Sequence, residues 1–217
     1  MAASSLLGGI RTYAHLGERD FTYENWMEAV RAGNTFVTVG PLIAFSVDWK
    51  PAGGRVDLPA GGGTIDVAWT VESVNVPIAQ VEVIAGGLVA EQVNTGNVLS
   101  TSGSASVKIT DSTWVALRVR GSYYGREGDI AAHTSSVQIV AGEKPLFVVT
   151  DAMAVLEQIE GAIAYVDTLA PRPEAQRYKR LRATLESAHT RLHQRLHQKG
   201  VYHQHTPLHG HDRVREH

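Results

Sequence analysis

The feature that most constrains this chain is a series of short alternating runs between residues 42 and 141. Seven runs rich in strand-forming residues follow one another there, and breaks rich in Gly, Asn and Ser separate them. In one run the apolar Val119 lies between Arg118 and Arg120, so one face of the strand is apolar and the other is charged. Seven half-buried strands in about 100 residues predict an antiparallel, immunoglobulin-like β-sandwich, which we place at residues 42–149. The runs are LIAFSVDW, TIDVAWTVES, IAQVEVIAGG, LVAEQVN, ASVKIT, TWVALRVRG and HTSSVQIV.

Residues 1–41 predict a short strand, a helix and a second strand ahead of the sandwich. Thr22 is a suitable N-cap for the helix, and Gly33 suits the left-handed position that follows its C-terminus. One face of this helix is apolar, and few residues precede it that could cover that face. We therefore expect self-association through the face that contains Trp26. The face consists of Tyr23, Trp26, Met27 and Val30.

Residues 150–199 predict two amphipathic helices that form an antiparallel hairpin. Asp151 is the expected N-cap of the first helix, and the PRP sequence at 171–173 separates the two. From residue 200 onward the periodicity ends, so residues 200–217 are expected to form a disordered, His-rich tail. The chain as a whole is thus predicted to be mainly β with additional α-helices.

Composition and charge exclude several classes of protein. The 217 residues include no Cys, so neither a disulfide framework nor a thiolate metal site is possible. No run approaches the length of a membrane span and no secretory signal is recognisable, so a soluble protein without a membrane partner is expected, in a compartment that the sequence does not indicate. Residues 171–217 hold 10 Lys and Arg against 4 Asp and Glu. No aromatic residues or nucleic-acid motif accompany this charge, so we read it as a solvated helix face and expect no nucleic-acid partner.

The histidines do not predict a metal centre. Three of them recur at every fourth position on the second predicted helix, a spacing that can place two ligands on one ion, but they drift across the flank of the leucine stripe and turn His197 toward solvent. Four others in the tail resemble a loose chelator that cannot build a catalytic cavity. We therefore expect neither a physiological metal nor another cofactor in this chain. The helix residues are His189, His193 and His197, and the weak tail candidates are His203, His205, His209 and His211.

A few aromatic side chains are candidates for ligand contact. Tyr123, Tyr124 and Arg126 share one predicted loop that could contact a ligand, although a solvated, Tyr-rich turn is the favoured interpretation. Trp69 and Trp114 could stack on a ligand, but their place in the strand alternation favours the core for both.

Several segments, taken in order, resemble the C-terminal half of a known enzyme family. The segments GGIRTYAHLG, WMEAVRAGNTFVTVGPLI, PIAQVEVIAGGLVAE, AHTSSVQIV and DAMAVLEQIEGAI are similar to those of the carbaryl-hydrolase-like (CehA/McbA) metallohydrolases of the PHP superfamily, over roughly residues 8–190. The resemblance implies that residues 1–41 are the end of a metal-binding barrel and that the parent protein uses a divalent metal, Zn or Mn. It also implies that Arg11, Tyr13 and His133 lie at the edge of a pocket.

No catalytic or cofactor-binding residue can be carried over from that family. The family's metal ligands include an H-x-H pair near the start of the barrel, and this chain has no such pair before residue 203. The resemblance therefore implies a non-catalytic C-terminal part of a metal-dependent hydrolase that acts on carbamate, ester or phosphoester-like bonds. The alternative is a free-standing β-sandwich module that binds a small molecule or a carbohydrate.

Overall fold

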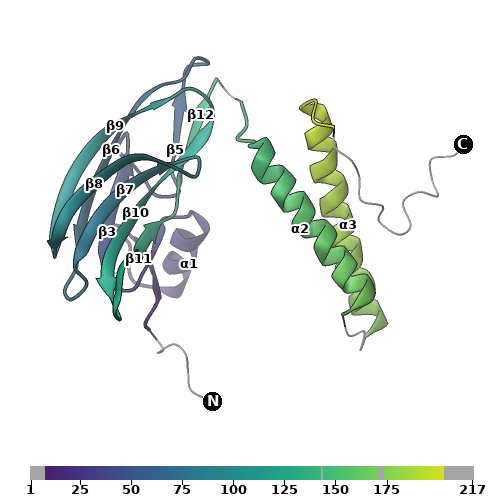
Figure 1. The fold of residues 1–217 in the computed structure, drawn as a ribbon, viewed down its shortest axis with the longest axis horizontal. Helices are drawn as coiled ribbons and strands as arrows, with labels where there is room; N and C mark the ends of the chain where they lie inside the picture. The colour runs from purple at the N-terminus through teal and green to yellow at the C-terminus, as the bar shows by residue number, and fades with distance from the viewer. Residues whose placement is uncertain (1–7, 143, 171–173, 203–217) are drawn as a thin grey trace, which may run out of the picture. The chain divides into compact units, whose positions relative to one another are not determined.

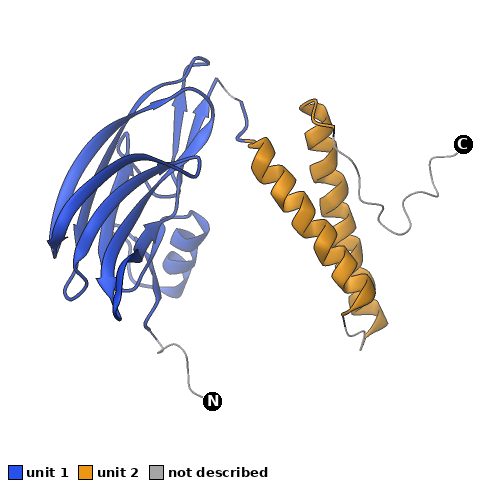
Figure 2. Ribbon diagram, viewed as in Figure 1, with its two compact units in different colours: residues 1–146 blue, residues 147–217 orange. Residues whose placement is uncertain are grey.

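The computed structural model describes residues 8–142, 144–170 and 174–202. It divides the chain into two compact units, Met1–Leu146 and Phe147–His217 (Figure 2). Among the described residues, no helix has the length and apolar character that crossing a membrane requires.

The first unit contains two β-sheets (Figure 1). Neighbouring strands run antiparallel, except that β12 and β5 are parallel. The larger sheet has the order β1-β2-β11-β10-β12-β5. Strand β7 pairs with the other edge of β10, and β8 pairs with β7. The smaller sheet has the order β4-β3-β6-β9. The strands of the larger sheet are β1 (Arg11–Ala14), β2 (Thr35–Thr38), β5 (Arg55–Leu58), β7 (Ile78–Ala85), β8 (Leu88–Val98), β10 (Thr113–Tyr123), β11 (Arg126–Thr134) and β12 (Val137–Ala141), and those of the smaller sheet are β3 (Leu42–Val47), β4 (Lys50–Pro51), β6 (Gly63–Glu72) and β9 (Ser100–Ile109).

The inward faces of the two sheets form one hydrophobic core, which confirms the predicted sandwich. On β6 every second residue is buried, as period-two alternation requires, and Trp69 at 5% exposure is one of them. On β10 the buried residues include Val115, Leu117 and Val119, and these belong to the same core cluster as the β6 residues. The sandwich is thus closed by aliphatic side chains from both sheets.

The strands are more numerous than the seven expected runs. Neither β4 nor β5 was predicted, and the run HTSSVQIV is split between the end of β11 and β12. The segments NTGN and TSGS, expected as breaks, lie within β8 and β9. A physical reason is visible in β9: Gly103 pairs with Trp69, and a Cβ atom on Gly103 would lie 2.6 Å from the indole ring. The small residues of this strand make room for a large neighbour and do not mark a turn.

The N-terminal segment belongs to the sandwich sheet. Helix α1 (Tyr23–Arg31) begins as predicted, because the Thr22 hydroxyl accepts a hydrogen bond from the Asn25 amide at 3.2 Å. It ends as predicted too: Gly33 has φ +73°, and the amide of Asn34 donates to the carbonyl of Ala29 at 3.0 Å. Strand β2, which follows α1, pairs with β11 and thereby joins the larger sheet. The expected barrel remnant is therefore not confirmed, and no boundary between compact units falls near residue 41.

The apolar face of α1 is only partly exposed. Tyr23 is 72% exposed, whereas Trp26, Met27 and Val30 are partly buried within the chain. Self-association through Trp26 stays a prediction.

The second unit is an antiparallel helical hairpin of α2 (Val149–Thr168) and α3 (Ala175–Gln198), as expected. Asp167 near the end of α2 accepts hydrogen bonds from Arg182 near the start of α3, and Leu156 shares a core cluster with Leu196 at the far end of α3. The hydrogen bond from Arg182 to Asp167 raises the pKa of the guanidinium. Asp151 lies in the first turn and is not the N-cap, because the helix begins after Val148. The predicted tail from residue 203 onward lies outside the described residues.

Candidate binding groove

A groove of about 510 Å³ opens between the two sheets of the sandwich. The larger sheet contributes residues of β1 and β2, and the smaller sheet contributes residues of β3 and β6, so the groove lies where these strands of the two sheets part. Most of its lining is apolar or aromatic, and a few polar side chains are interspersed. Concave, largely apolar sites of this size with a few polar groups are typical of small-molecule binding. The lining residues include Tyr13, His15, Asn34, Phe36, Phe45 and Glu72.

A pair of stacked aromatic rings lies on the β1–β2 side of the groove. Tyr13 and Phe36 are opposite each other in the antiparallel register of β1 and β2. Their ring centroids are 5.3 Å apart and their planes differ by 6°, an offset-stacked geometry. The Arg11 guanidinium carbon lies 6.0 Å from the centroid of the Tyr13 ring. Because Tyr13 is 38% exposed, its ring is available to a ligand without unfolding the strand pair.

The polar groups of the groove are partly engaged by the backbone. The Asn34 side-chain amide donates to the carbonyl of His15 at 2.9 Å, which continues the β1–β2 pairing past the end of both strands. The Thr35 hydroxyl is 2.7 Å from that of Ser135. Glu72, the last residue of β6, is an exposed carboxylate among the lining side chains. The lining of the groove is therefore mostly apolar, and the Glu72 carboxylate adds one negative charge at its margin.

The predicted pocket-edge residues do not all lie together. Tyr13 lines the groove, and Arg11 is next to it on the same strand. His133 does not line it: its β2 partner is Val37, and its Nδ1 atom is 2.7 Å from the carbonyl oxygen of Thr134. His133 thus has the structural contacts of a strand residue.

The Tyr-rich loop is stabilised from within. The Tyr123 hydroxyl donates to the carbonyl of Ile130 at 2.8 Å, and Arg126 forms an exposed ion pair with Asp129 at 3.6 Å. Tyr124 is 76% exposed and meets the Tyr123 ring edge-on. The loop carries exposed aromatic surface, whereas Trp69 lies in the core as alternation predicts and Trp114 is partly buried.

The helix histidines are part of the hairpin. His189 lies 3.1 Å from Glu160 of the other helix, and both side chains are largely buried. The rings of His189 and His193 are stacked at 5.8 Å, and that of His197 lies 4.1 Å from His193. Across residues 8–142, 144–170 and 174–202, no group of three or more His, Cys, Asp or Glu side chains could hold a metal ion. The side chains there do not fit the Zn or Mn that the resemblance implies, and the tail histidines from His203 to His211 lie outside these ranges.

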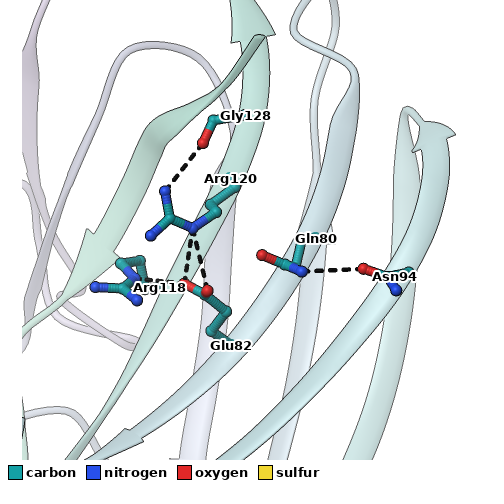
Figure 3. A network of polar contacts seen from close by, with 6 residues as sticks. All are labelled: Gln80, Glu82, Asn94, Arg118, Arg120 and Gly128. Carbon is teal, nitrogen blue, oxygen red and sulfur yellow. Dashed lines mark hydrogen bonds and ion pairs between the residues drawn. The ribbon is translucent and has the colours of Figure 1, made fainter. Parts of the chain in front are cut away.

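A second polar cluster lies on β7 and β10 of the larger sheet (Figure 3). Glu82, only 3% exposed, accepts hydrogen bonds from Arg118 and, at 3.1 and 3.2 Å, from Nε of Arg120. Arg120 also donates to the carbonyl of Gly128 at 3.0 Å. Burial raises the pKa of Glu82, but the hydrogen bonds and charges of Arg118 and Arg120 outweigh it and hold the pKa below its ordinary value of 4.5. This cluster is a closed ion-pair network, so we assign it a structural role.

Sequence reasoning missed most of the groove. Phe36, Phe45 and Glu72 gave no signal by themselves, because each is an ordinary residue in its own strand. The aromatic pair could have been predicted by pairing the two short strands of the N-terminal segment. The antiparallel register then places Tyr13 opposite Phe36 on the same face.

Comparisons with known proteins find only remote structural similarity. No protein-family model matches the chain, and no curated protein matches it. The solved structures similar to it include the fibronectin(III)-like modules of Clostridium thermocellum CbhA, with 12% identity and a TM-score of 0.34 over 46% of this chain and 96% of that one. A CARDB domain from Pyrococcus furiosus has 13% identity and a TM-score of 0.32 over 46% and 96% of the two chains. The sulfur carrier protein SoxY from Chlorobium limicola has 10% identity and a TM-score of 0.31 over 45% and 79%. Similarity of this extent carries no argument about fold or activity.

Proposed function

We propose that this chain is a non-catalytic β-sandwich module that binds a small, ring-containing molecule in the groove next to Tyr13. The observation that supports this function is the groove itself, which combines about 510 Å³ of space with a stacked aromatic pair on one wall. A carbohydrate fits the site less well, because sugars require many hydrogen-bonding groups and the groove is mostly apolar.

The charges at the margin suggest which ring compounds bind best. Among the residues that the structure describes, Glu72 is the one carboxylate that lines the groove, and no Lys or Arg lines it with Glu72. A neutral or cationic ring ligand therefore keeps the favourable apolar contact, whereas an anionic one meets Glu72 at short range. Tryptamine and indole-3-propionate test this point, because they share one ring and carry opposite charges.

Saturation-transfer NMR and calorimetry with these two probes test the function. Tryptamine should bind more tightly than indole-3-propionate, and Glu72→Gln should reduce the difference. Tyr13→Ala should weaken tryptamine binding about tenfold, since an aromatic contact contributes about 0.5–1.5 kcal/mol beyond its buried area. Tyr124→Ala is the matched control, because Tyr124 is an exposed tyrosine on a loop outside the groove lining. Equal weakening by both variants, or no binding of either probe, would refute the function.

A second candidate function rests on the ordered series of segments from residue 8 to residue 190 that resembles PHP-type metallohydrolases. On this proposal the chain is the non-catalytic C-terminal part of such an enzyme, and the divalent metal belongs to a barrel encoded upstream. Nucleotide sequence upstream of Met1 that encodes an in-frame barrel with an H-x-H pair would support it. The purified chain, supplied with Zn or Mn, should not hydrolyse aryl carbamates, esters or phosphoesters above background.

A further inference from the structure

The helical hairpin has two unlike sides. On one side of the α2–α3 seam lie its polar contacts, Glu160 with His189 and Arg182 with Glu186. The seam itself is formed by side chains such as Leu156 and Leu196, which are 2% and 0% exposed. The other side carries apolar side chains that the seam does not bury completely.

These apolar side chains form one stripe on each helix. On α2 they follow the spacing i, i+4, i+7, and on α3 they follow the same spacing. Val155 is 46% exposed and Leu181 is 49% exposed, and the other members are partly buried. The stripes are Val155, Ile159 and Ala162 on α2 and Leu181, Leu185 and Ala188 on α3.

Both stripes lie on the same side of the hairpin. Val155 precedes Leu156 by one position and Ala188 precedes His189 by one position, and both Leu156 and His189 face the other helix. Two antiparallel helices are related by a two-fold axis that is perpendicular to the plane containing both helix axes. Residues that precede an inward-facing residue by the same number of positions therefore lie on the same side of the hairpin. The hairpin thus has a continuous second apolar face. A helix with two adjacent apolar seams is the pattern of a four-helix bundle and not of an isolated pair.

The charges of the two helices are opposite and complementary. Helix α2 carries four acidic residues and no basic one, and α3 carries six basic residues and one acidic. Arg177 and Arg195 flank the α3 stripe at its two ends, while Asp151 lies at the start of the α2 stripe. No ion pair among the described residues engages these three charges. An acidic helix placed over a basic helix would satisfy them.

We propose that the second apolar face binds the same face of another copy of this chain, so that two hairpins form a four-helix bundle. Charge selects the arrangement: α2 of one copy lies over α3 of the other, because two like helices facing each other would bring like charges together. A symmetric dimer of this kind uses one self-complementary patch on each copy.

Sedimentation velocity of the full chain, at several concentrations, tests the proposal. The wild type should run as a dimer that dissociates on dilution, and Val155→Glu and Leu181→Glu should each raise its dissociation constant about tenfold or more. Ala154→Glu and Ala183→Glu are matched controls, because each is an exposed neighbour on the same helix that points away from the face. Helix content, read by circular dichroism, should be equal in all four variants.

The absence of cysteine permits a second measurement of the arrangement. Chains with Ala162→Cys and chains with Ala188→Cys are mixed in equal amounts and oxidised. Disulfides between the two kinds of chain should exceed twice those within either kind, which is the ratio that random pairing gives, because α2 faces α3 of the partner.

Three results would overturn the proposal. A wild type that is monomeric at every concentration shows that the face is covered within the chain or by a different protein. Association that Trp26→Glu removes and Val155→Glu leaves intact assigns the contact to α1. Preferred linkage between two Ala162→Cys chains would refute the charge-selected arrangement.

Discussion

Replacing Glu82 with glutamine should destabilise the sandwich by about 1–3 kcal/mol, since hydrogen bonds to a charged group each contribute about 1.5–3 kcal/mol. The magnitude follows from the surroundings of the carboxylate. Glu82 is 3% exposed and receives hydrogen bonds from two arginines, so its loss leaves two positive charges two residues apart on β10. The side chains of Arg118 and Arg120 are 21% and 31% exposed, so both regain water contacts when the carboxylate is lost. The cost therefore stays below the roughly 3–5 kcal/mol of a fully buried broken pair.

Tryptophan fluorescence during urea unfolding measures this change in the first unit alone. All four tryptophans, at positions 26, 49, 69 and 114, precede residue 146, so the helical hairpin does not contribute to the signal. Asp57→Asn is the control, because the Arg55–Asp57 pair has the same chemistry with side chains 56% and 66% exposed. Its expected effect is at most about 0.5 kcal/mol, the usual range for surface pairs.

Equal stability losses in the two variants would contradict this prediction. Such a result would mean that the arginines find equivalent partners elsewhere, and that the buried carboxylate contributes no more than a surface one.

The remaining predictions concern pH, one close backbone approach and the hairpin core. Because the pKa of Glu82 is depressed in the folded chain, its stabilisation is present above its ordinary pKa of 4.5 and is lost as pH falls through the lower folded value; urea midpoints of wild type and Glu82→Gln should therefore converge as pH falls below 4.5. Gly53→Ala should destabilise the sandwich by about 3 kcal/mol or more, since its Cβ would lie 1.9 Å from the carbonyl oxygen of Ala32 at φ +79°, whereas Gly61→Ala, with open space around it, should be nearly neutral in the same fluorescence assay. Leu196→Ala, at a fully buried position, should cost the hairpin about 2–5 kcal/mol, measured as an earlier loss of helical ellipticity on heating.

Local features of the fold could be predicted from the sequence because they depend on neighbouring residues. The N-cap Thr22 and the left-handed Gly33 are set by backbone groups within one turn of the helix. The burial of Trp69 follows from strand alternation alone. By contrast, the sequence around Gly103 predicts a break between strands, and this prediction is wrong. Gly103 lies within β9, where a side chain would collide with Trp69 on another strand, and the sequence around Gly103 does not reveal that contact.

The candidate groove could not be predicted because it depends on pairings between distant segments. Tyr13 and Phe36 meet only through the register of β1 and β2, and Phe45 and Glu72 come from the other sheet. Glu82 reads as a solvent-facing residue of an alternating strand, yet two arginines some 36 and 38 residues away cover it. In each case the sequence supplies the residue type and the tertiary pairing supplies the environment.

The measurement that most directly tests the binding function is an amide chemical-shift titration of the labelled chain with tryptamine. The largest shifts should occur at Tyr13, Phe36 and Glu72, with saturation at one equivalent and little change at Tyr124. Shifts centred on the Tyr123–Tyr124 loop, or spread evenly over the surface without saturation, would contradict it.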